Sequence, residues 1–352
     1  MTVYIQSAEQ ISVQPPLSDA WFACPTEHYR VYVRAQEPDY KPLLNPNKSR
    51  RMGKILRRAV VSAQKAVQQS GIAMPDAVIS GTGLGCIENT EIFLTAMLQE
   101  GEEFLQPTHF MQSTHNTISS QIAIELQCHG YNTTYSHKGI SFDSALLDTF
   151  LQFRAGTIHS ALVGGYDEMT PNFQLMLSRL GDWRRDGENV TLRRGEEAFA
   201  GETSVSMMLS DHLTEENKPL CRVAAVEMLY KPTMEQLQAS LDKILQENEC
   251  TLSNIDAVMT GMNGNKSTDN SYQKLLNGLF GGRPVGAYKQ IFGESYTASG
   301  LGVYACAVCL QKGEIPAHLL LQQPTALKNV QRILLYHQYD LKNHSLILLA
   351  SC

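Results

Sequence analysis

A short segment occurs twice in this chain, and this repeat constrains the fold more than any other feature of the sequence. Residues 76–81 read Asp-Ala-Val-Ile-Ser-Gly and residues 256–261 read Asp-Ala-Val-Met-Thr-Gly, so the copies lie 180 residues apart in a chain of 352. Short apolar runs that end in glycine suit strands buried on both faces. A repeat at about half the chain length predicts a duplicated structural unit.

An amphipathic helix is expected before each copy of the repeat. Apolar residues between Met52 and Val67 recur at spacings of three and four, and so do those between Met234 and Leu245. This spacing gives a helix one buried face. Thr233 and Gln236 have the spacing of a capping box, which marks the start of the second helix. Because both copies follow such a helix, duplication of an α/β unit explains the repeat better than chance.

The rest of the chain alternates expected strands with expected helices. Such alternation predicts a mixed or parallel sheet that helices cover on both faces. The polar, glycine-broken stretch 180–201 and the irregular stretch 18–47 are expected to run over the surface. Strands are expected at 158–163, 205–209 and 346–349, and helices at 117–126, 144–154, 272–279 and 297–310.

Composition and charge limit the classes of function. Apolar residues make up 43% of the chain and charged residues 18%, which is typical of a globular protein with a large core. The net charge of -6 argues against a nucleic-acid partner, although an acidic carrier protein stays compatible with it because a sum hides local patches. No apolar run reaches the roughly 20 residues that span a bilayer, and no signal peptide pattern is present, so a cytoplasmic location is expected.

The cysteines do not predict a metal site or a disulfide framework. Eight cysteines are scattered along the chain. Cys306 and Cys309 have Cys-x-x-Cys spacing, but no second pair accompanies them, as a structural zinc site would require. Reduced, partly buried thiols are therefore expected, with no metal and no cofactor.

The segment between Gly130 and Gly165 resembles the nucleophile region of the β-ketoacyl-acyl-carrier-protein synthases, which are condensing enzymes of the thiolase type. In that family a glycine opens a strand that ends in the active-site cysteine at a strand-to-helix turn. A small residue follows six positions later, and a Gly-Gly pair ends the next strand. The matches without a gap are Gly130, Ala145, Gly156 and Gly164-Gly165, and further matches are Gly81 to Gly85, Asn116, Gly201-Glu202, and Lys289 with Gly293 of a Lys-x-x-x-Gly-His signature.

The resemblance implies the thiolase fold, with two similar five-element halves in a layered αβαβα sandwich. The N-terminal half is expected over residues 1–215 and the C-terminal half over residues 216–352. Members of the family dimerise through the strand before the nucleophile turn, which here is expected near 132–136. Strand pairing across a two-fold axis makes a large interface.

The same alignment places no catalytic group at any of the three positions that the family chemistry uses. Gly139 stands where the cysteine nucleophile is expected, Asn263 where the first histidine is expected, and Glu294 where the second follows the glycine. Glycine has no nucleophile, asparagine cannot shuttle a proton, and a carboxylate would repel an enolate oxygen. Asp269 matches the aspartate after the first histidine loop. The chain alone is therefore expected to be inactive.

Other residues near these positions have structural explanations. Lys289 and Glu294 could form an internal ion pair that fills a redundant pocket, because a buried carboxylate needs a partner to stay charged. Asn116 and Glu202 are expected to be structural or pocket residues. Lys138 and Ser141 flank Gly139 and could act as unorthodox nucleophiles, although the turn aims one side chain at the pocket. The family's glycine-rich Phe-Gly-Phe-Gly-Gly gate corresponds to 337–344, which contains no glycine.

Three hypotheses for function follow. The first is a non-catalytic subunit, similar to a chain length factor, that pairs with an active ketosynthase in type II fatty acid, polyketide or aryl-polyene synthesis. The second is an active β-ketoacyl synthase or acyltransferase with an unorthodox nucleophile. The third is a module that binds an acyl chain or an acyl carrier protein. The expected partners are an active ketosynthase or a second copy of the chain, and an acyl carrier protein.

Overall fold

Ten of the strands form one continuous sheet system in the computed structural model, which describes residues 2–28, 30–102, 105–180, 199–213, 218–321 and 323–352. A separate two-stranded sheet pairs the two shortest strands. The strands are β1 (Val3–Ile11), β2 (Ala77–Gly81), β3 (Tyr131–Tyr135), β4 (Ser160–Asp167), β5 (Thr203–Ser210), β6 (Cys221–Tyr230), β7 (Ala257–Thr260), β8 (Val285–Ala287), β9 (Glu314–Ile315), β10 (Leu327–Lys328), β11 (Arg332–Tyr339) and β12 (Asn343–Ala350).

Helices connect these strands and cover them. Short 3-10 helices add single turns, of which η2 (Lys138–Ile140) matters for the site. The α-helices are α1 (Pro46–Ser49), α2 (Lys54–Ser70), α3 (Ile87–Glu100), α4 (Pro107–Gln112), α5 (Thr117–Leu126), α6 (Ser141–Arg154), α7 (Pro171–Leu180), α8 (Met234–Glu247), α9 (Lys266–Leu279), α10 (Lys289–Phe292) and α11 (Ala298–Lys312).

The strand order shows the duplication that the repeated segment predicts. The first half runs β3-β2-β4-β5-β1, and the second runs β8-β7-β11-β12-β6 in the same pattern. In each half the first three strands are parallel and the last two antiparallel to their neighbours. The halves join where Val3–Ile5 of β1 pairs with Cys221–Val223 of β6. The predicted fold class is therefore confirmed.

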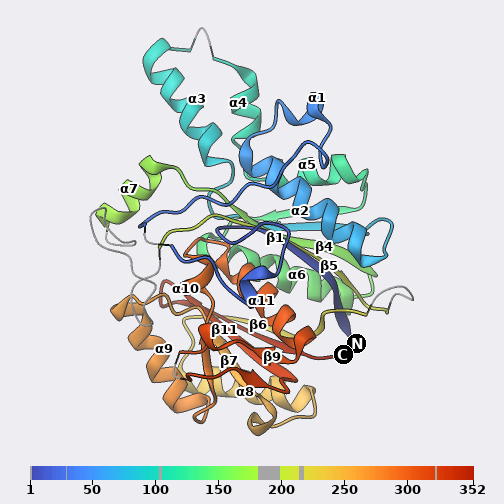
Figure 1. The fold of residues 1–352 in the computed structure, drawn as a ribbon, viewed down its shortest axis with the longest axis vertical. Helices are drawn as coiled ribbons and strands as arrows, with labels where there is room; N and C mark the ends of the chain where they lie inside the picture. Colours follow the sequence, from blue (N-terminus) through green and yellow to red (C-terminus); the bar gives the residue numbers. More distant parts are fainter. Residues whose placement is uncertain (1, 29, 103–104, 181–198, 214–217, 322) are drawn as a thin grey trace.

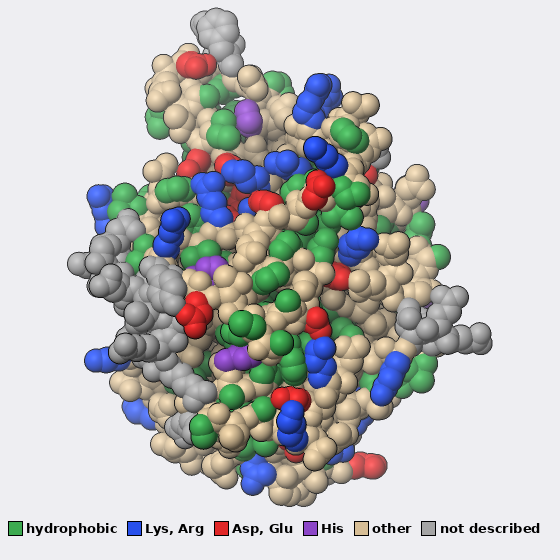
Figure 2. Space-filling view, in the orientation of Figure 1, with side chains coloured by type: hydrophobic (Ala, Val, Ile, Leu, Met, Phe, Trp, Pro, Cys, Tyr) green, Lys and Arg blue, Asp and Glu red, His purple; other side chains and the backbone are tan. Residues whose placement is uncertain are grey.

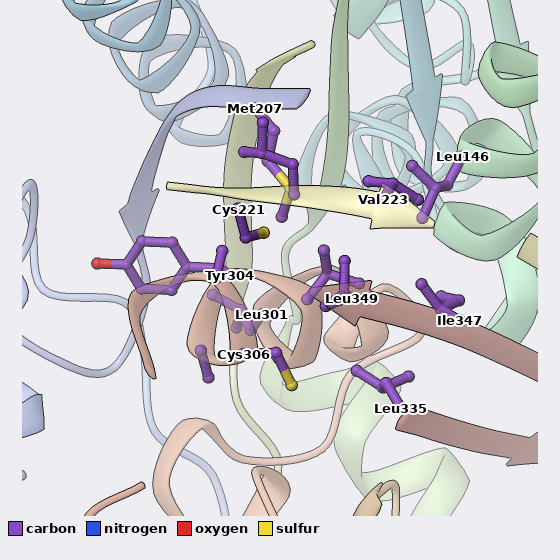
Figure 3. Close-up of a cluster of buried hydrophobic side chains, with 14 of the residues drawn as sticks. Leu146, Met207, Cys221, Val223, Leu301, Tyr304, Cys306, Leu335, Ile347 and Leu349 are labelled. Atoms are coloured by element: carbon purple, nitrogen blue, oxygen red, sulfur yellow. The ribbon is translucent and has the colours of Figure 1, made fainter. Parts of the chain in front are cut away.

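Figure 1 shows the five layers. Helices α2 and α5 cover one half-sheet from outside, α8 and α9 cover the other, and α6 and α11 lie between the two half-sheets. Every residue of α11 from Ala298 to Leu310 is buried, as a helix between two sheets requires. Figure 3 shows side chains from both central helices and both half-sheets in one cluster, among them Leu146, Met207, Cys221, Val223, Leu301, Cys306, Leu335 and Leu349.

The repeated aspartates have the same role in both halves. The carboxylate of Asp76 accepts hydrogen bonds from the backbone amides of His159 and Ser160, both at 2.9 Å, where β4 begins. The carboxylate of Asp256 accepts from the amides of Gln331 and Arg332 at 2.7 and 2.8 Å, where β11 begins. Each aspartate thus fixes the register between a parallel pair of strands, which explains why the repeat includes it.

Most predicted elements match the structure, with boundary shifts of a few residues. Helix α6 begins at Ser141, three residues before its predicted start, because η2 leads directly into it. The predicted boundary between residues 215 and 216 lies outside the described residues and stays a prediction, as does most of the predicted surface stretch 180–201. None of the described helices is long and apolar enough to cross a membrane.

We expect Asp76→Ala and Asp256→Ala to destabilise the fold by similar amounts, about 1–2 kcal/mol each, because each removes an ionised acceptor from two backbone amides. Urea unfolding measures the loss. Asp242→Ala is the matched control, since Asp242 is exposed on α8 and its carboxylate accepts a hydrogen bond from the side chain of Gln238 one turn away. Equal stability of Asp256→Ala and Asp242→Ala would contradict the register role.

Candidate functional site

A cavity of about 420 Å³ contains all three positions where the family's catalytic groups are expected. Gly139 comes from η2, Asn263 from the loop after β7, and Glu294 from the segment after α10. Lys289 also lines the cavity. The other lining residues are Lys138, Gly261, Thr268, Tyr272, Ser295, Tyr296, His337, Gln338, Tyr339, Asp340 and Leu341.

The tip of the turn before α6 has no space for a side chain. Gly139 is buried, and a Cβ atom built on it would stand 2.1 Å from Cδ2 of Tyr339. Real Cβ contacts are never this short, so any residue larger than glycine would have to displace the tyrosine ring. The tyrosine thus occupies the space into which a nucleophile at this position would project.

The tyrosine reaches the turn because the chain segment that matches the family's gate is folded as a hairpin. Tyr339 is the last residue of β11, and β12 returns antiparallel from Asn343. Asp340 and Leu341 in the turn have positive φ angles of 53° and 52°. Two such residues suit a tight hairpin turn, although glycine or asparagine would adopt these angles at lower cost. Here a tight hairpin with a fixed aromatic side chain replaces the glycine-rich gate.

A second tyrosine completes this aromatic contact. The rings of Tyr296 and Tyr339 pack edge to face with centroids 6.1 Å apart. A Cβ on Gly83 would stand 2.3 Å from the Cβ of Tyr296, so any side chain at position 83 would overlap this tyrosine. We call Tyr296 and Tyr339 the tyrosine plug.

The two positions expected to hold histidines are joined in one ion network with Lys289. The side-chain amide of Asn263 donates to Oε2 of Glu294 at 2.9 Å, and the ammonium of Lys289 donates to the same oxygen at 2.8 Å. The Lys289 and Glu294 side chains are only 6% and 16% exposed. The carboxylate has the cationic partner that a poorly solvated charge needs. The arrangement neutralises Glu294 and offers no histidine for proton transfer.

Asp269 supports this network from behind. Its carboxylate accepts hydrogen bonds from the backbone amides of Asn263 and Gly264 at 3.2 and 2.9 Å. Burial raises the pKa of Asp269, and these amides oppose the rise. Asp269 therefore shapes the loop that presents Asn263 to the cavity.

Glu202 and Asn116, the remaining predicted residues, lie away from this cavity. The Glu202 carboxylate accepts from the backbone amide of Ala35 at 2.8 Å and lies 2.8 Å from the guanidinium of Arg58, whose side chain is 2% exposed. Glu202 thus ties an irregular N-terminal segment to the core. Asn116 is exposed at the N-cap of α5, where its backbone carbonyl accepts from Ser120.

The alternative nucleophiles have different environments. Ser141 is fully buried, its hydroxyl accepts from the amide of His137 at 2.8 Å, and its bonds to the carbonyls of Lys138 and Thr82 complete its hydrogen bonding. This hydroxyl holds the turn together. Lys138 is exposed, has a φ of 46° and is one of the residues that line the cavity. Among the described residues that line the cavity there is no cysteine.

Sequence reasoning missed a buried imidazole–carboxylate pair at this cavity. His337 lines the cavity, and its Nδ1 lies 3.2 Å from Oδ2 of Asp143 on α6. Burial alone would raise the pKa of Asp143, but the charge and hydrogen bond of His337 lower it, with help from Ser299. Asp143 lies one residue before the predicted helix 144–154, so the predicted helix face gave no signal for this buried carboxylate, which requires a partner.

Comparisons with known proteins agree with this geometry. A family model described as the N-terminal domain of β-ketoacyl synthases matches residues 33–210. Because this match covers half of the chain, the chain belongs to the β-ketoacyl synthase family. No protein among those with curated functions matches the sequence.

Solved structures share the fold at low sequence identity. The ishigamide ketosynthase/chain length factor has a TM-score of 0.83 at 17% identity, with 100% of this chain and 99% of that chain covered. The ketosynthase ApeO in complex with its chain length factor ApeC from Xenorhabdus doucetiae scores 0.79 at 14%, covering 100% and 98%. A type II polyketide synthase acyl-carrier protein in complex with its ketosynthase, AntDE:AntF, scores 0.78 at 12%, covering 100% and 99%. These likenesses show the fold.

A second cavity, between α3 and the end of β4, contains a buried carboxylate with a perturbed pKa. Glu168 is 4% exposed and accepts from the backbone amide of Glu88 at 3.0 Å. Burial raises the pKa of Glu168 to about 7. The cavity is lined by several charged residues besides it, namely Arg34, Lys54, Glu88, Glu91, Glu100 and Glu202.

We expect Gly139→Ala to destabilise the protein by roughly 1–3 kcal/mol, because the added methyl group overlaps the ring of Tyr339. Tyr339→Ala removes the overlap, so the double variant should lose less stability than the two single losses predict together. Urea unfolding of the four proteins measures this coupling. Strictly additive losses would show that the ring does not occupy the space over Gly139.

The raised pKa of Glu168 predicts a stability that falls as the pH rises. The folded protein holds this proton more tightly than the unfolded chain, so the stabilisation is complete below an unfolded pKa of about 4.5 and is lost as the pH passes about 7. Relative to Glu168→Gln, the wild type should lose roughly 3 kcal/mol between pH 4 and pH 8. Unfolding at a series of pH values tests this. Parallel curves for the two proteins would refute it.

Proposed function

We propose that this chain is a ketosynthase-like subunit that does not condense acyl groups and that pairs with an active ketosynthase, in the manner of a chain length factor. The observation that carries the proposal is the repacking of the condensing site. Tyr339 fills the nucleophile position at Gly139, and the Lys289–Glu294–Asn263 network fills the histidine positions. The scaffold around these positions keeps the family fold, which is consistent with a role in assembly.

An exposed strand supports pairing with another thiolase-fold subunit. Strand β3 is the outer strand of the first half-sheet, so one of its edges has no strand partner among the described residues. Tyr131 and Asn132 on it are exposed. A free edge of this kind pairs readily with another chain unless it is protected.

An apolar arm formed by α3 and α4 is a second candidate surface for a partner. Helices α3 and α4 project from the body of the molecule in Figure 1 and pack on each other through Phe93 and Phe110. Leu98 at the end of α3 is 87% exposed. Exposed apolar side chains gathered on one such arm favour an interaction surface. The exposed apolar residues of the arm are Ile92, Leu94, Leu98, Phe110 and Met111.

A basic segment supports contact with an acidic carrier protein. Residues 30–58 contain nine lysines and arginines and two acids, in a chain whose net charge is -6. In Figure 2, Lys and Arg side chains gather on the upper part of the visible face, where Figure 1 places α1 and α2. Complementary charge speeds and orients the encounter with an acidic partner. The exposed members of the segment are Arg30, Arg34, Lys41, Arg50 and Arg51.

Co-expression with the active ketosynthases of the same organism tests the proposal. We expect a stable one-to-one complex by size-exclusion chromatography and mass measurement. Leu98→Asp should weaken it at least tenfold, because the charge would be desolvated in an apolar interface. Leu213→Asp is the matched control, since Leu213 is also exposed but lies outside the arm. A stable homodimer that binds no active ketosynthase would reject the proposal.

A further inference from the structure

A buried carboxylate at the second cavity has one oxygen that no described residue binds. Glu168 follows β4 directly, is 4% exposed and lines this cavity. Its Oε1 accepts a hydrogen bond from the backbone amide of Glu88 at the start of α3. Its Oε2 has no partner among the described residues, yet it is accessible, unlike the fully enclosed Oδ2 of Asp167. This oxygen is therefore available to a ligand in the cavity.

The cations around the cavity do not supply a partner for Glu168. The ammonium of Lys54 lies 2.9 Å from Oε1 of Glu88, and Nη1 of Arg58 lies 2.8 Å from Oε2 of Glu202. Both cations are thus engaged by other acids. Arg34 lines the cavity as well, but it is exposed and forms no ion pair with a carboxylate of the described residues. A buried carboxylate in this position needs a cation from outside the chain in order to stay charged.

A second acid on α3 adds to the negative charge of the cavity. Glu88 and Glu91 are three positions apart on this helix, so both face the same side. The carboxylate of Glu91 accepts hydrogen bonds from the hydroxyl of Thr170 and the side-chain amide of Asn172, which are both neutral. Altogether five acids and two bases line the cavity, so the excess charge favours a cationic ligand.

The apolar part of the lining decides which class of cation fits. Ile92 and Ala96 of α3 and Met169 and Pro171 after β4 line the cavity together with the acids. Apolar side chains suit an alkyl stem better than a hydrated ion. Among the described residues, no group of three or more His, Cys, Asp or Glu side chains is placed to hold a metal ion. An alkylammonium group combines an apolar stem with a head of three N–H donors, and it is small enough for a cavity of about 420 Å³.

We propose that this second cavity binds an alkylammonium group, with Oε2 of Glu168 as its acceptor, Glu91 as a second anionic group and the apolar lining around its stem. Both a free amine and the lysine side chain of another protein carry this group, and the test below separates the two sources. The site shares no lining residue with the cavity at Gly139. It therefore goes beyond the proposed assembly role and does not depend on it.

Binding of the cation is expected to release a proton from Glu168. Burial raises the pKa of Glu168 to about 7, and the carboxylates of Glu88 and Glu202 add to this rise, while the backbone amide of Glu88 and the charge of Arg58 oppose it. Burial also raises the pKa of the nearby Cys86 thiol, which stays neutral. A bound ammonium favours the ionised carboxylate. Because this carboxyl group is about one-tenth ionised at pH 6 and about nine-tenths at pH 8, the Kd should fall about tenfold between them.

Isothermal titration calorimetry of the full chain with n-butylammonium chloride tests the site. n-Butanol has the same stem without the charge and is the matched ligand control. Glu168→Gln and Glu91→Gln each remove one anionic group and keep the shape of the side chain. Glu247→Gln is the matched protein control, because Glu247 is exposed on α8 and does not line the cavity. Thermal unfolding checks that every variant is folded.

We expect the wild type and Glu247→Gln to bind butylammonium at pH 8 with a Kd of roughly 1 mM, as suits so small a ligand. Glu168→Gln should bind it at least tenfold more weakly and lose the pH dependence, and Glu91→Gln should bind it several-fold more weakly. No binding by the wild type, equal binding by folded Glu168→Gln, or equally tight binding of butanol overturns the proposal. If Glu168→Gln does not fold, the butanol comparison and the pH dependence of the wild type decide.

A capped lysine, with its backbone amine acetylated and its carboxyl group methylamidated, separates the two sources of the ammonium group. Binding as tight as that of butylammonium supports the site as one for a lysine side chain of a partner protein. Much weaker binding supports it as a site for a free amine. Complex formation with a ketosynthase should be unchanged in Glu168→Gln, so failure of the cation site and failure of the assembly role are distinguishable.

Discussion

The packing of two buried helices between two half-sheets determines most of what this molecule can contain. Helices α6 and α11 are covered on both sides, so their side chains need either an apolar neighbour or a hydrogen-bond partner. Asp143 is the charged residue of α6 that is fully buried, and Ser299 and His337 supply its partners from α11 and β11. This buried carboxylate therefore connects elements of both halves of the duplicated fold behind His337, which lines the cavity.

The residues at the positions where the alignment expects catalytic groups depend on other residues that pack against them or bind them. A glycine at position 139 with a small residue at position 339 would leave a void, and voids in a packed interior cost contacts. The ring of Tyr339 fills that space and contacts Tyr296. At the other end, Glu294 is acceptable in a poorly solvated place because Lys289 and Asn263 donate to it. Each residue that replaces a catalytic group has a partner.

The fold could be predicted from the sequence to a large extent because its signals are local or repeated. The repeated segments place two equivalent strands, and their aspartates make equivalent backbone contacts. The capping box at Thr233 forms as expected. The convergence of Gly139, Asn263 and Glu294 followed from the motif alignment, since spacing within each motif is short.

The contacts that define the cavity could not be predicted, because they join residues far apart in the chain. Asp143 and His337 are 194 positions apart, and neither local sequence indicates that the two side chains meet. The role of Tyr339 depends on the hairpin at Asp340 and Leu341, which adopts positive φ angles without glycine. Local propensity disfavours that turn, so only the pairing of β11 with β12 specifies it.

Under the proposed function, these long-range contacts mean that no single substitution would install the family's catalytic groups. A cysteine at position 139 would meet the tyrosine plug, and a histidine at position 294 would leave Lys289 without its carboxylate in a nearly closed environment. Removing one partner of a buried ion pair is more costly than replacing both. The residues at the expected catalytic positions therefore form a packed arrangement of their own on the family scaffold, in which each depends on partners from elsewhere in the chain.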